Sequence, residues 1–280
     1  MKKRQKEKII YFFLGLLCVS VVSLVIAMIG FTFVKGLPVM NWTFISQMPR
    51  MGMKEGGILP AIIGTLYLML GTVLIALPLG ILSAIYLTEY AKRGLLYRGI
   101  RLAIFNLAGV PSVVYGLFGL GLFVLFLGFG SSLLSGCLTL SCLILPVIIA
   151  SSEEALLSVD PSYREASLAL GATRWQTIQK VVLPHAMPGI LTGAILGMGR
   201  AAGETAPILL TAVAFFLPKL PQSVFDQVMA LPYHLYIIST QVPDMPAEIQ
   251  YGTAFILMAV VGIFFGIATW IRYHFRSLVK

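Results

Sequence analysis

Six long apolar stretches separated by short polar segments organise this 280-residue chain. A helix that crosses the roughly 30 Å apolar core of a bilayer needs about 20 residues, and the stretches are about that long or longer. They cover residues 9–34, 58–87, 102–127, 132–150, 188–215 and 252–271. The pattern predicts an all-α integral membrane protein with six transmembrane helices, so both chain ends should lie on the same side of the membrane.

The composition supports a membrane protein. Apolar residues make up 58% of the chain and charged residues only 11%, with a mean hydropathy of +0.93. Soluble domains carry about 25% charged residues, so a soluble globular fold is excluded. The first stretch, 9–34, exceeds the roughly 7–15 apolar residues of a signal peptide. We therefore expect an uncleaved first helix behind a tail at 1–8. The few Cys and His residues are scattered, and we expect no metal site.

The placement of positive charge predicts the orientation. Most of the 20 Lys and Arg residues lie in the tail 1–8, the loop 88–101, the segment of about 151–187 and the tail 272–280. The opposite face carries only Lys35, Arg50, Lys54 and Lys219. Because positive residues concentrate on the cytoplasmic side of membrane proteins, we expect both termini in the cytoplasm. This distribution explains the net charge of +9 without a nucleic-acid partner.

The polar segment 151–187 has the signals of two short helices. Asp160 is suited to cap a first helix, and Gly171 is suited to end it because glycine adopts the left-handed conformation easily. Thr173 and Gln176 have the spacing of a capping box for a second helix. Such a helix pair, which we call the elbow, could transmit movement if it sat in a cleft of another subunit. The alternative is an ordinary turn between two spans.

A spaced pattern runs through the elbow: Glu165-Ala166-Ser167, then Gly171-Ala172, then Val181-x-Leu183-Pro184, where the proline is expected to end the second helix. The pattern resembles the EAA loop of bacterial ABC importer permeases, E-A-A-x3-G-x9-I-x-L-P, with Ser for the second Ala and Val for Ile. The resemblance implies that a separate ATPase contacts Glu165, Ala166, Ser167, Gly171, Ala172, Leu183 and Pro184. No Gly-Lys dipeptide occurs, so the chain lacks a phosphate-binding loop. Any ATP-Mg would be used by a partner, and we expect no cofactor on this chain and no enzyme activity.

Two charges interrupt the fifth stretch. An Arg at a helix centre costs about 2.5–3.5 kcal/mol to insert, so Arg200 needs a partner or a water-filled path. Glu204 follows four residues later, on the same helix face. The pair could join two helices, or Arg200 could bind a tetrahedral oxyanion through its planar fork of donors. Glu204 would then orient Arg200 or accept a hydrogen bond from a protonated phosphate. Glycines at four-residue steps before the pair would allow close approach, and Pro207 favours a kink.

Two segments carry a more specific resemblance. Arg200-Ala-Ala-Gly203-Glu204-Thr205-Ala-Pro207 and the run from Ala108 to Gly119 are similar to phosphate ABC permeases of the PstA type. This implies a type I importer, MetI-like fold over 58–271, with the coupling loop at about 151–187. It also implies a substrate path that includes Arg200, Glu204, Gly203 and Thr205. The implied partners are phosphate, a second PstC-like permease, a PstB-like ATPase dimer and an external PstS-like binding protein, in a bacterial cytoplasmic membrane.

Other functions stay open at this point. The chain could carry another oxyanion, such as sulfate, molybdate or phosphonate. It could be a membrane enzyme acting on lipid phosphate through Arg200 and Glu204, or a sensor of phosphate. Binding of an ATPase would distinguish an importer from a membrane enzyme or a sensor. Two local features are also left with alternatives. Residues 216–251 form either an external cap or a loop packed on its own helices, and Asn106, Ser112 and Tyr115 bond between helices or line a path.

Overall fold

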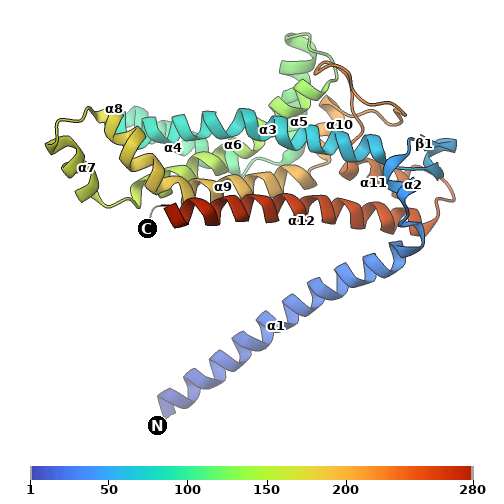
Figure 1. Cartoon of the computed structure of the whole chain (residues 1–280), viewed down its shortest axis with the longest axis horizontal. Helices are drawn as coiled ribbons and strands as arrows, with labels where there is room; N and C mark the ends of the chain where they lie inside the picture. Colours follow the sequence, from blue (N-terminus) through green and yellow to red (C-terminus); the bar gives the residue numbers. More distant parts are fainter. Residues whose placement is uncertain (1, 279–280) are drawn as a thin grey trace.

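Four long helices lie side by side along the longest axis of the molecule in the computed structural model, which describes residues 2–278 (Figure 1). They are α3 (Leu59–Ile85), α6 (Leu133–Leu157), α9 (Leu183–Gly203) and α12 (Ala247–Leu278). α6 packs against both α3 and α9, and α12 packs on α9. α1 (Lys2–Gly36) meets α12 near its own C-terminal end, where the rings of Phe33 and Phe255 lie 4.8 Å apart, and then diverges from the bundle (Figure 1).

Shorter elements connect and extend these helices. They are the 3-10 turns η1 (Leu37–Val39) and η2 (Met51–Met53), α2 (Trp42–Ser46), the antiparallel strands β1 (Pro49–Arg50) and β2 (Glu55–Gly56), the π-helices η3 (Tyr86–Tyr90), η4 (Leu120–Phe126) and η5 (Ile178–Val182), and the helices α4 (Leu95–Ala108), α5 (Ser112–Gly119), α7 (Pro161–Ala169), α8 (Arg174–Thr177), α10 (Ala206–Thr211) and α11 (Leu231–Thr240). The three π-helices matter for function because such turns mark places where a helix changes course.

The predicted helical membrane fold is confirmed, with a correction to the third span. Among the described residues, five helices are long and apolar enough to cross a membrane. The stretch 102–127 is not one straight helix, because α4 and α5 meet at an angle of 105°. The bend lies before Pro111, which has no N–H to continue the ladder of hydrogen bonds. The Tyr115 hydroxyl donates to the Leu107 carbonyl at 2.8 Å across this bend, so it bonds within the stretch 102–127 and not to another span.

The helices at both termini extend beyond the predicted spans 9–34 and 252–271. The tail 1–8 was expected outside the first helix, yet α1 already begins at Lys2. Likewise α12 continues through the expected tail 272–280 as far as Leu278. Lys, Arg and Glu are good helix formers and no Gly or Pro interrupts these segments, so the helices run on. Met1 and residues 279–280 of the predicted tails lie outside the described residues.

Residues 216–251 are structured, and they pack on the chain's own helices. Their helix α11 is held by buried Leu231, Ile237 and Ile238. The Leu231 N–H donates to the Thr65 hydroxyl of α3 at 2.8 Å. The segment is therefore a fixed part of the bundle and not a flexible linker.

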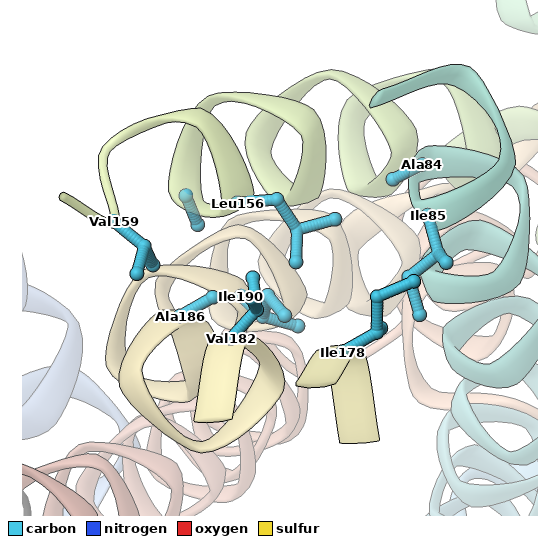
Figure 2. Close-up of a cluster of buried hydrophobic side chains, with 9 residues drawn as sticks. Ala84, Ile85, Leu156, Val159, Ile178, Val182, Ala186 and Ile190 are labelled. Atoms are coloured by element: carbon cyan, nitrogen blue, oxygen red, sulfur yellow. The ribbon is translucent and has the colours of Figure 1, made fainter. Parts of the chain in front are cut away.

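The helices next to the elbow pack closely together, which fixes the position of its base. Figure 2 shows side chains from α3, α6, η5 and α9 meeting in one buried cluster, which we call the elbow cluster. It contains Ala84, Ile85, Ala155, Leu156, Val159, Ile178, Val182, Ala186 and Ile190. Gly189 and Gly193 let α9 approach α6: a Cβ on Gly189 would lie 2.6 Å from that of Ala155, and Gly193 faces Ser151. The predicted role of these glycines in close helix approach is confirmed.

Candidate functional site

The elbow forms as its capping residues predict. The Asp160 carboxylate accepts a hydrogen bond from the Ser162 N–H at 2.8 Å and begins α7. This bond lowers the pKa of Asp160, because it stabilises the charged carboxylate. α7 ends before Gly171, which has a φ of +83°. Thr173 then caps α8, and Gln176 completes the capping box with a bond of 2.8 Å from the Thr173 N–H.

The predicted end of the second elbow helix at Leu183-Pro184 is wrong. α8 runs through η5 into α9 as one continuous helical path from Arg174 to Gly203. The π turn provides the physical reason. Its last bond joins the Leu183 N–H to the Ile178 carbonyl, five residues back, so the helix is locally wider where it must admit a proline. The second elbow helix is therefore the beginning of a membrane-length helix.

The structure divides the predicted ATPase-contacting residues into two groups. Glu165, Ala166, Gly171 and the partly buried Ser167 and Ala172 lie in the elbow. Leu183 and Pro184 instead lie at the start of α9, where Leu183 packs against the elbow cluster. Leu183 and Pro184 are both partly buried, as Ser167 and Ala172 are.

An apolar patch on the elbow was not predicted. Leu170 is 89% exposed, and Leu168, Trp175 and Tyr163 are each 49% exposed. These side chains stand in a segment that separates two apolar stretches and is otherwise largely polar. Exposed large apolar side chains in an otherwise polar segment are available for a protein–protein contact. The signal in the sequence was available, since all four apolar residues interrupt a polar segment.

The pair in the fifth stretch forms, but in a different local geometry. Arg200 is in the last turn of α9, and its Nε lies 3.6 Å from Oε1 of Glu204. Glu204 is not on the helix: its φ of −75° and ψ of 129° are extended. The ring of Pro207 would clash with the carbonyl of residue 203, four positions earlier, and α9 ends at that residue. The expected kink is therefore a break at Glu204 and Thr205, after which α10 begins.

This break leaves the ion pair partly open. The side chains of Arg200 and Glu204 are 33% and 19% exposed. Within the part of the chain whose side chains the structure describes, Arg200 forms no other ion pair and no side-chain hydrogen bond, so most of its donors are free. Gly203 has open space where a Cβ would stand. A guanidinium with unused donors beside a helix break can bind an anion, as broken helices do in many transporters.

The chain resembles known transport proteins along nearly its whole length. Residues 76–219 match the family described as binding-protein-dependent transport system inner membrane component. A probable ABC transporter permease protein, YqgI, of Bacillus subtilis is 32% identical over 97% of this chain and 96% of its own. A probable phosphate transport system permease protein, PstA, of Methanocaldococcus jannaschii is 33% identical over 98% of this chain and 95% of its own. The phosphate transport system permease protein PstA 1 of Mycobacterium tuberculosis is 38% identical over 78% and 70%.

Solved structures share the fold. A chain of a bacterial ABC transporter that imports alginate superposes with a TM-score of 0.68 at 15% identity, covering 98% of this chain and 99% of its own. A chain of the methionine ABC transporter MetNI, in an inward-facing conformation, gives a TM-score of 0.57 at 19% identity, covering 78% and 94%. The arrangement of the helices is thus that of the membrane-spanning chains of ABC importers, which confirms the predicted fold.

Proposed function

Because the chain belongs to the family of binding-protein-dependent transport system inner membrane components, we propose that it is the permease subunit of an ATP-driven importer of inorganic phosphate. The relatives named as phosphate permeases carry this proposal, since one of them aligns over 98% of the chain. The family match at 76–219 includes both the elbow and the Arg200–Glu204 pair. In this proposal, a partner chain binds ATP, whereas this chain contacts phosphate.

The elbow is the proposed docking site for an ATPase subunit. Its tip combines the exposed Leu170 with the left-handed turn at Gly171, and its base is fixed on the elbow cluster (Figure 2). A firm base and an exposed tip let the helix pair move as one body when a cleft of the ATPase closes around it. The ATPase uses ATP-Mg, and this chain supplies no residue to the hydrolysis.

The Arg200–Glu204 pair is the proposed contact for phosphate. Free donors on a guanidinium can form two parallel charge-assisted hydrogen bonds with a tetrahedral oxyanion. Glu204, at 3.6 Å, orients Arg200 and can accept a hydrogen bond from a protonated phosphate. A sulfate ion carries no such proton at neutral pH, so it would meet Glu204 as an uncompensated like charge. Thr205 and Gly203 border the same break, and Gly203 leaves room for the anion.

Transport by alternating access follows from these two sites. An external PstS-like binding protein delivers phosphate to a cavity between this chain and a second, PstC-like permease. Closure of a PstB-like ATPase pair moves the elbow, and the long helices rock to open the cavity inward. In this arrangement the elbow and both termini face the cytoplasm, as the distribution of Lys and Arg indicates.

Reconstitution tests the proposal. The chain should co-purify with an ATPase and a second permease, and the complex in proteoliposomes should accumulate labelled phosphate only with ATP and the binding protein. Leu170→Glu should keep the fold, because the side chain is 89% exposed, but weaken ATPase binding. A complex that binds the ATPase but accumulates no phosphate would contradict the proposed substrate. A chain that binds no ATPase would contradict the proposed role.

A further inference from the structure

We propose that Glu89 and Tyr90, at the end of α3, bind both helices of the elbow, so that α3 moves together with the elbow during the transport cycle. Neither residue belongs to the EAA-like pattern or to the predicted phosphate contact. Both lie in η3, the π turn that continues α3. The inference rests on the proposed function, because it assigns a positioning role within ATP-driven transport.

The first elbow helix is attached through Arg164. Its Nε and Nη2 lie 3.2 and 3.1 Å from Oε1 of Glu89, a residue 75 positions away in the chain. The same guanidinium donates at 2.7 Å to the carbonyls of Leu156 and Val159, which belong to the end of α6 and the turn after it. The two charged side chains are 21% and 11% exposed, so the pair is largely shielded from water. Arg164 therefore connects α7, α6 and α3 at one point.

The second elbow helix is attached to the neighbouring residue. The guanidinium of Arg174, at the start of α8, lies 5.3 Å from the centre of the Tyr90 ring, in cation–π contact. Consecutive residues of η3 thus receive one arginine from each elbow helix. The hydroxyls of Ser167 and Thr177 lie 2.9 Å apart and join the two helices to each other. With these three contacts, the elbow and the end of α3 form one connected body.

Apolar contacts also join the end of α3 to the base of the elbow. Ala84 and Ile85, the last residues of α3 before η3, pack in the elbow cluster against residues of α6 and η5 (Figure 2). η3 closes with a bond of 2.8 Å from the Ala91 N–H to the Tyr86 carbonyl, five residues back. This wider turn ends the helix close to the elbow, and Glu89 and Tyr90 belong to it.

α3 carries the attachment to the opposite end of the bundle (Figure 1). There Thr65 accepts the hydrogen bond from the Leu231 N–H of α11 at 2.8 Å, and Gly64 lies against the Met229 carbonyl. The chain path itself connects the elbow to α6 and α9, not to α3. The contacts at Glu89 and Tyr90 add a direct polar link between the elbow and α3 to the packing of α3 on α6 and α9, and α3 extends this link to the segment 216–251.

The experiment uses the assembled importer in proteoliposomes with the binding protein. We compare the wild type with Glu89→Gln, Glu89→Asp and the double variant Glu89→Gln/Tyr90→Leu. Glu154→Gln is the matched control, because Glu154 is an exposed carboxylate near the same end of α6. The measurements are ATPase subunits bound per complex, ATP hydrolysed with and without loaded binding protein, and phosphate accumulated per ATP.

We expect Glu89→Gln to keep the ATPase bound and lower phosphate accumulated per ATP at least about fivefold, the lower end of typical coupling between sites. Glu89→Asp, which keeps the charge, should restore most of the loss, and the double variant should be worse than Glu89→Gln. Two results would overturn the inference: an unchanged ratio of transport to hydrolysis in the double variant, or equal loss of ATPase binding in the Asp and Gln variants. A wild-type complex without ATP-driven phosphate uptake would instead count against the proposed function.

Discussion

The Arg200→Ala variant distinguishes two roles for Arg200, a contact with the substrate and a purely structural ion pair. The Arg200–Glu204 pair is 3.6 Å long and its members are 33% and 19% exposed. Exposed pairs contribute about 0.2–1 kcal/mol, whereas breaking a fully buried pair costs about 3–5 kcal/mol. The partial exposure places this pair near the lower range, so we expect a loss of about 1–2 kcal/mol in unfolding free energy. The subunit should still fold and assemble.

The effect on transport should be much larger. A hydrogen bond to a charged group is worth about 1.5–3 kcal/mol, and a guanidinium can give two to one anion. Loss of both therefore corresponds to about 3 kcal/mol or more, which is at least about a hundredfold in uptake. Arg200→Lys keeps the charge without the planar fork and should fall between the two.

The assay is uptake of labelled phosphate by purified complexes in proteoliposomes, with thermal unfolding and subunit stoichiometry measured on the same samples. Arg272→Ala is the matched control, because Arg272 is also a partly buried arginine and joins two helices by donating to Thr192 at 3.3 Å. It should keep most of the uptake. Failed assembly of Arg200→Ala, or uptake reduced equally by both variants, would refute the reasoning and leave Arg200 a structural residue.

Three further predictions concern the fold around the sites. Gly171→Val places a β-branched residue at a φ of +83° and should cost about 1–3 kcal/mol of local strain, with weaker ATPase association in pull-down; full association would show that the turn is not needed. Gly189→Ile sets a Cβ 2.6 Å from that of Ala155 and should lower the unfolding free energy by about 1–3 kcal/mol in thermal melts. Gly262→Ile in α12, where a Cβ meets nothing within 4 Å, should be milder, and an equal effect of the two variants would show that close approach at Gly189 is not the cause. His234 is buried in α11, and burial lowers its pKa to about 4. The unfolded chain binds this proton near pH 6.5, so stability should fall as the pH drops from about 6.5 to 4, by about 3 kcal/mol, and His234→Phe should flatten this dependence.

Local signals in the sequence were sufficient for the elbow. Asp160, Gly171 and the Thr173–Gln176 box act through bonds to residues within three positions, so their effect can be derived from spacing alone. The glycine steps before Arg200 were equally readable, since close helix approach requires small residues wherever the partner lies.

The effect of proline was harder to predict. Pro184 sits inside a continuous helix, whereas Pro111 and Pro207 accompany a bend and a break. A π turn, η5, precedes Pro184, whereas Pro78, Pro146 and Pro188 lie inside regular α-helices, so a proline does not by itself determine where a helix ends. Spacing alone does not contain this information.

The contact between Arg164 and Glu89 could not be predicted from the sequence, for another reason. The two residues are 75 positions apart and belong to different predicted loops. Only the packing of α3 against α6 brings the loops together. The extended conformation of Glu204 could not be foreseen either, because Arg200 and Glu204 were expected on one helix face.

Competition by sulfate tests the central claim most directly. Uptake of labelled phosphate at micromolar concentration would be measured in cells with and without this chain, each with excess sulfate or excess unlabelled phosphate. The account predicts uptake that requires the chain, is abolished by unlabelled phosphate and is unaffected by sulfate, because sulfate offers Glu204 no proton. Uptake that persists without the chain, or that sulfate inhibits as strongly as phosphate, would contradict it.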